Sequence, residues 1–82
     1  MTSAQVRMAR AALNWTVRDL AEATGLHRNT ITNIEVGRYA GDPATLAMIK
    51  SVFNREGVQF IDENGGGPGV RLRKPSGSPK KK

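Results

Sequence analysis

Four polar side chains whose hydrogen-bonding groups suit nucleotide bases occur close together in the sequence. They are Arg28, Asn29, Thr32 and Asn33, and they are interleaved at helical spacing with the apolar residues Ile31 and Ile34. If the isoleucines face a core, the polar four share the opposite face of the helix. Arginine can donate two hydrogen bonds to guanine, asparagine can pair with adenine, and a threonine methyl can contact that of thymine. The pattern predicts a base-reading surface. The alternatives are an ordinary solvated polar face and, for Arg28 alone, a phosphate contact.

The residues before this segment predict a tight connection between two helices. Thr16 offers an N-cap with Asp19 at the favourable offset, and Gly25 ends the helix that follows. Ala21 is small enough for close helix approach, and His27 lies where the next N-cap belongs. Two helices joined by a short turn containing glycine form a helix-turn-helix, whose second helix enters the major groove of DNA.

The run TVRDLAEATGLHRNTITNIEVG, at positions 16–37, resembles the Xre/Cro family of bacterial and phage repressors. The likeness extends from Val6 to about Phe53. It implies a lambda-repressor-like domain in which Arg10 of the first helix forms a structural ion pair with Glu35 at the end of the third. The family often has a phosphate-contacting glutamine at the position of Val17, so we expect that contact to be lost or replaced.

Several side chains around the predicted reading helix are of types that contact DNA phosphates. They are Thr16, Arg18, His27, Arg38 and Tyr39. Such contacts fix register without reading sequence. His27 is the only histidine and no second ligand is placed beside it, so a structural role at the N-cap is its alternative and no metal site is expected.

The remaining elements follow from hydrophobic periodicity. Helical spacing predicts a first helix from Thr2 or Ser3 to near Asn14, and a fourth from Asp42 and Pro43 to Gly57. From position 58 to 73 the pattern alternates around a glycine-rich centre, which predicts a β-hairpin. Its shared apolar face would hold Val58, Phe60, Val70 and Leu72.

The predicted fold class is mainly α, with a helix-turn-helix domain at 1–57 and a strand pair at 58–73. The last nine residues, KPSGSPKKK, have no apolar group and predict a disordered basic tail at 74–82. This tail could strengthen DNA binding by neutralising phosphates, or serve only as a solubilising end.

Composition limits the class of protein. The 82 residues allow one domain with a small core, and a net charge of +6 favours a polyanionic partner, either nucleic acid or an anionic membrane surface. There are no cysteines, so disulfides and thiolate zinc sites are excluded. No apolar run approaches the ~20 residues of a membrane span, and no signal peptide is recognisable. We therefore expect a cytoplasmic protein without membrane association.

So small a core favours a second copy of the chain. We expect a homodimer joined through the fourth helix and the strands, with an interface formed by Phe53, Val58, Phe60, Val70 and Leu72. Two reading helices would then face half-sites ~34 Å apart on an inverted repeat. The alternative is a monomer with an intrachain hairpin.

An enzyme is not expected, because no nucleophile–base pair or phosphate-binding loop is recognisable, and no cofactor is expected either. The predicted function is a sequence-specific regulator of transcription that binds double-stranded DNA, most simply a repressor. The alternative is an antitoxin or adaptor whose main partner is a protein, such as a toxin or RNA polymerase. Beyond the DNA-binding fold only the hairpin and tail remain, which favours the regulator.

Overall fold

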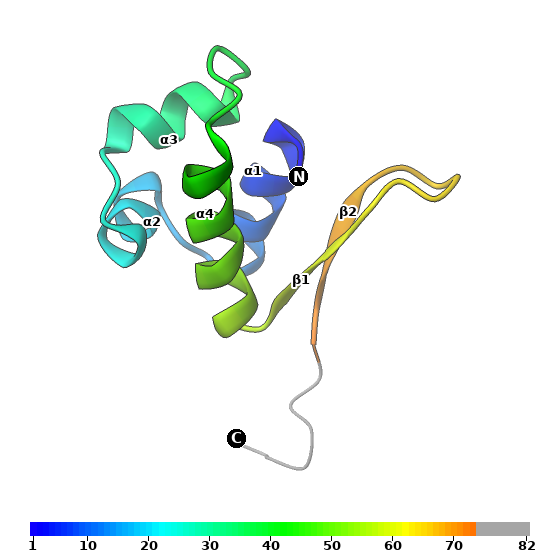
Figure 1. Cartoon of the computed structure of the whole chain (residues 1–82). Helices are drawn as coiled ribbons and strands as arrows, with labels where there is room; N and C mark the ends of the chain where they lie inside the picture. Colours follow the sequence, from blue (N-terminus) through cyan, green and yellow to red (C-terminus); the bar gives the residue numbers. More distant parts are fainter. Residues whose placement is uncertain (74–82) are drawn as a thin grey trace, which may run out of the picture.

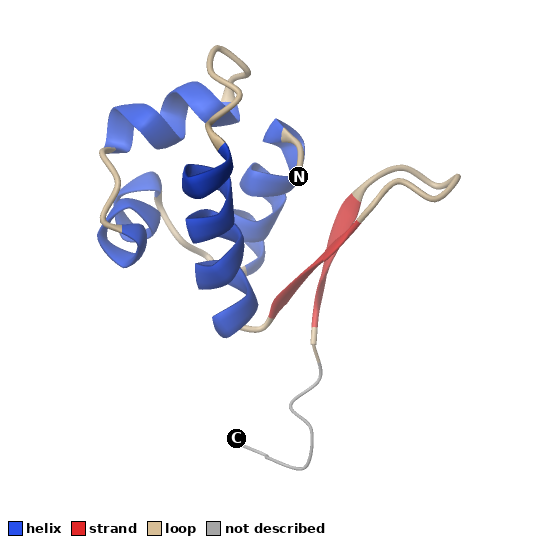
Figure 2. Cartoon of the chain, viewed as in Figure 1, coloured by secondary structure: helices blue, strands red, loops and turns tan. Residues whose placement is uncertain are grey.

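The computed structural model describes residues 1–73, which form four helices followed by two strands (Figures 1 and 2). The elements are α1 (Ser3–Ala12), α2 (Val17–Thr24), α3 (Arg28–Glu35), α4 (Pro43–Arg55), β1 (Val58–Ile61) and β2 (Gly69–Leu72). The predicted mainly α fold with a C-terminal hairpin is confirmed. The tail predicted at 74–82 lies outside the described residues.

Local capping explains where the first two helices begin and end. Thr2 and Gln5 form a capping box, in which each side chain accepts a hydrogen bond from the other residue's main-chain amide. Thr16 and Asp19 repeat this arrangement at the start of α2. Gly25 ends α2 in the left-handed conformation with φ of 78°, which glycine adopts without steric cost.

Asp42 caps α4 and ties its stability to pH. Its Oδ1 accepts a 2.7 Å hydrogen bond from the Thr45 amide, and this bond, with a smaller contribution from the Thr45 hydroxyl, lowers the pKa of Asp42 below its ordinary value of 3.8. A carboxyl whose pKa is lower in the folded state stabilises the fold above its unfolded pKa. That contribution is lost as pH falls through the folded value.

Replacing Asp42 with asparagine tests this linkage. Asparagine is an equally good N-cap but does not titrate. We expect the melting temperatures of D42N and the wild type to differ by a constant amount above about pH 5, and the wild type to lose stability relative to D42N below about pH 4. Thermal unfolding followed by circular dichroism between pH 2 and 7 measures the difference. A difference independent of pH would contradict the linkage.

The core lies where the four helices meet the start of β1. Its ten buried apolar residues are Val6, Ala9, Leu20, Ala21, Ile31, Ile34, Ile49, Val52, Phe53 and Val58. The ring of Phe53 packs between Trp15 and Phe60, with both centroid distances at 5.9 Å. Every helix contributes to this cluster, so the orientation of α3 is fixed by the same packing that stabilises the whole domain.

The hairpin pairs within the chain and packs on α1 and α4 (Figure 1). The antiparallel register places Val58 opposite Leu72 and Phe60 opposite Val70, which puts the four apolar residues on one face as predicted. Val58, Phe60 and Val70 of that face pack on the chain's own core, whereas Leu72 is exposed, and Val58 and Phe53 are completely buried within one chain. Within one chain these two residues have no exposed surface left, and the expectation that they form a dimer interface stays a prediction.

Gln5 attaches the hairpin to α1. Its side chain is 1% exposed, and its amide nitrogen donates to the carbonyl oxygens of Ile61 and Gly69, both at 2.9 Å. These two residues face each other at the end of the strand pair. One buried side-chain amide therefore donates a hydrogen bond to a main-chain carbonyl of each strand where the strands leave the core. Neither the amide nitrogen nor the two carbonyls are left without a partner.

Candidate nucleic-acid interface

The two faces of α3 differ sharply in burial. Ile31 is 0% and Ile34 3% exposed, so both point into the core. Arg28, Asn29 and Thr32 are exposed, and Asn33 is half-buried. The helix therefore presents its guanidinium, hydroxyl and carboxamide groups to solvent, in the arrangement that a major-groove helix requires.

A buried ion pair fixes the C-terminal end of α3 to α1. The guanidinium of Arg10 donates from Nε and Nη2 to the two carboxylate oxygens of Glu35, at 2.8 and 2.9 Å. The Glu35 side chain is 6% exposed. The hydrogen bond to Glu35 raises the pKa of Arg10, and burial opposes the rise. Both carboxylate oxygens of Glu35 accept hydrogen bonds from Arg10, and these bonds offset the free-energy cost of burying the charge.

Further hydrogen bonds brace the same junction. Arg10 also donates from Nη1 to the Trp15 carbonyl at 3.0 Å, and the Arg7 guanidinium donates to the main-chain carbonyl of Glu35. The latter satisfies a carbonyl that the end of a helix leaves without an intrahelical partner. Three elements, α1, the α1–α2 loop and α3, are thus held together at one point.

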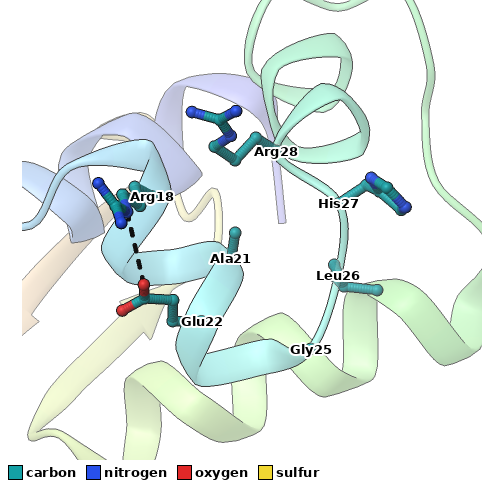
Figure 3. A pocket seen from close by; sticks show the side chains of 7 residues that line it. All are labelled: Arg18, Ala21, Glu22, Gly25, Leu26, His27 and Arg28. Atoms are coloured by element: carbon teal, nitrogen blue, oxygen red, sulfur yellow. Dashed lines mark ion pairs between the residues drawn. The ribbon is translucent and has the colours of Figure 1, made fainter.

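The turn between α2 and α3 is closed by buried Thr24. Its hydroxyl donates to the Leu20 carbonyl at 2.8 Å and accepts from the Leu26 amide at 3.2 Å. Ala21 is 8% exposed and lies beneath the start of α3 (Figure 3). These contacts set the angle between the two helices, and with it the direction in which α3 can enter a groove.

An open depression with a volume of about 640 Å³ lies between the two helices. It is lined by Arg18, Ala21, Glu22, Gly25, Leu26, His27 and Arg28 (Figure 3). The Arg28 side chain reaches toward the start of α2, where Arg18 lies, whereas the His27 ring points away from both. Arg18 contacts Glu22 in an exposed ion pair, at 3.5 Å from Nε to the carboxylate.

The other predicted phosphate contacts flank this helix pair. Thr16 is exposed, although its hydroxyl oxygen already accepts the Asp19 amide. His27 is exposed and its side chain makes no capping hydrogen bond. After α3, the amides of Arg38 and Tyr39 both donate to the Asn33 carbonyl, and both residues are exposed to solvent. All five residues thus have surface available to a ligand.

Glu22 and Arg7 are members of this region that sequence reasoning missed. Glu22 lies four residues after Arg18, a spacing typical of helical ion pairs, and this signal could have found it. The Arg7 contact with α3 depends on how α1 and α3 pack, and no local pattern predicts it. Val17 is half-buried against the core, and its side chain has no polar atom that could replace the glutamine contact to phosphate.

Two further observations concern other kinds of site. Within residues 1–73 there is no cluster of three or more His, Cys, Asp or Glu side chains placed to hold a metal ion. None of the helices in this part of the chain is both long and apolar enough to cross a membrane.

Comparison with known families agrees with the geometry. The helix-turn-helix family model matches residues 6–59, which span α1 to the start of β1. No curated protein matches the chain. The match covers more than half of the 82 residues and includes both helices of the motif and the core that orients them. The chain belongs to the Xre/Cro type of helix-turn-helix family, whose members are DNA-binding regulators.

Proposed function

We propose that this protein is a sequence-specific repressor that reads the major groove of double-stranded DNA with α3. The observation that carries the proposal is the exposed face of Arg28, Asn29, Thr32 and Asn33 on a helix whose opposite face is buried. Arg28 suits guanine, and the two asparagines suit adenine. Acting on chromosomal DNA, such a protein would work in the cytoplasm of a bacterium, or on a phage genome.

We further propose that Thr16, Arg18, His27, Arg38 and Tyr39 contact phosphates on either side of the groove. They lie just before α2 and in its first turn, between α2 and α3, and after α3, so they frame the reading helix. Contacts of this kind position a helix on the duplex and supply much of the affinity, whereas the base contacts supply the specificity.

The proposed active form is a homodimer on an inverted repeat. Two features support it: a small domain gains from a shared interface, and the chain exposes large apolar residues outside the core. Leu72 on the hairpin is 55% and Met48 on α4 is 46% exposed. Phe60 and Val70, both half-buried, would contribute the rest of the contact area.

Selection of bound sites from random duplexes tests the proposal. We expect an enriched inverted repeat with half-site centres ~34 Å apart, because two symmetric copies present two reading helices one helical turn apart. Sedimentation of the complex should give two chains per selected duplex. No enrichment over scrambled duplexes would contradict sequence-specific binding, and one chain on a single, unrepeated site would contradict the dimer.

A further inference from the structure

The protein uses the arginine–glutamate pair in two physically different ways. Arg10 and Glu35 form two short hydrogen bonds, and the Glu35 side chain is 6% exposed. Arg18 and Glu22 meet in one 3.5 Å contact, with their side chains 75% and 69% exposed. An exposed pair of this kind contributes little to stability, so its partners exchange readily for others. The second pair is therefore free to serve binding instead of folding.

The surroundings of the second pair suit an anion. Arg18 lines the depression from α2 and Arg28 lines it from α3, and Ala21 lies on α2 beneath Arg28 (Figure 3). Neither of the two ion pairs between described residues involves Arg28. Glu22 is the only carboxylate that lines the depression, and it contacts Arg18. An anion that enters the depression can contact two guanidinium groups, and that of Arg18 is already paired with Glu22.

We infer that the depression takes one backbone phosphate of the DNA, and that Glu22 limits the affinity of this site by holding Arg18. This inference rests on the proposed function. Binding replaces the Arg18–Glu22 contact with an Arg18–phosphate contact. The free energy needed to break the first contact reduces the net gain from the second. Glu22 then acts as a positioning residue, because it changes affinity through Arg18 and not by contacting DNA.

Glu22→Gln tests the inference. Removing the charge frees Arg18, so we expect about 2- to 5-fold tighter binding, the equivalent of one exposed ion pair. The selected operator and an unrelated duplex should gain equally, because phosphate contacts carry no sequence information. The gain should shrink at high salt, which screens exposed charges. Fluorescence anisotropy with both duplexes at several salt concentrations measures these effects.

A matched control separates this effect from that of net charge. Glu56→Gln makes the same charge change at the far end of α4, away from α3 (Figure 1), and should leave affinity nearly unchanged. In an Arg18→Gln background, Glu22→Gln should no longer tighten binding, because the held partner is gone.

Three results would overturn the inference while leaving the proposed function intact. These are a Glu22→Gln chain that binds like the wild type, an equal gain from Glu56→Gln, and a gain that persists without Arg18. If the wild-type chain selects no site over scrambled duplexes, the proposed function fails, and the inference fails with it.

Discussion

Asn29→Ala is expected to weaken binding to the selected operator by about 10- to 100-fold, while binding to an unrelated duplex stays unchanged. A bidentate asparagine–adenine pair contributes ~1–3 kcal/mol of discrimination, and alanine removes both hydrogen bonds. The same argument applies to Asn33, which shares the outward face of α3. Anisotropy titrations against the operator and its single-base-pair variants should show preference relaxed at one position for each replacement.

Such a loss could not be attributed to unfolding. Asn29 is exposed, and alanine has the higher helix propensity, so the replacement should leave the domain at least as stable. Asn33 contributes its main-chain carbonyl to the Arg38 and Tyr39 amides, and this acceptor survives replacement of the side chain. Asn64→Ala, in the exposed hairpin loop, is a control expected to bind like the wild type. Unchanged affinity and unchanged base preference in Asn29→Ala and Asn33→Ala would remove the proposed reading face.

The parts of this molecule that sequence predicted are those governed by local rules. The starts of the helices follow from caps such as Thr16 and Asp42, and the stop at Gly25 follows from its positive φ. The outward face of α3 follows from the spacing of Ile31 and Ile34, since a helix that buries one face must expose the other. These features needed no knowledge of neighbouring elements.

The features that sequence did not predict depend on packing between distant segments. Gln5 appears in sequence as a capping residue, yet its buried amide also holds the hairpin, more than fifty positions away. Phe53 and Val58 were expected at an interface because so small a core favours a second copy. Their burial within one chain depends on where the hairpin folds, which periodicity leaves undetermined. The Arg10–Glu35 pair was expected only through family resemblance, since 25 positions separate the partners.

Arg10→Met is expected to destabilise the domain by about 3 kcal/mol. Removing one partner of a buried ion pair costs ~3–5 kcal/mol, because the remaining charge stays buried without compensation. The lower end applies here, since the Arg10 side chain is 24% exposed and water can partly solvate the site. For a domain of this size that is a large share of the total stability. Urea unfolding followed by the fluorescence of Trp15, the only tryptophan, should show a lowered midpoint.

Two further variants test whether the uncompensated charge is the cause. Arg18→Met breaks an ion pair of the same chemistry at an exposed site and should cost less than about 1 kcal/mol. Adding Glu35→Leu to Arg10→Met removes the stranded carboxylate, and because apolar replacement of both partners is often close to neutral, it should restore much of the lost stability. If the double variant were no more stable than Arg10→Met, the loss would instead lie in the hydrogen bond to Trp15 and in the packing of the arginine stem. The uncompensated charge of Glu35 would then contribute little to the loss of stability at the junction that orients α3.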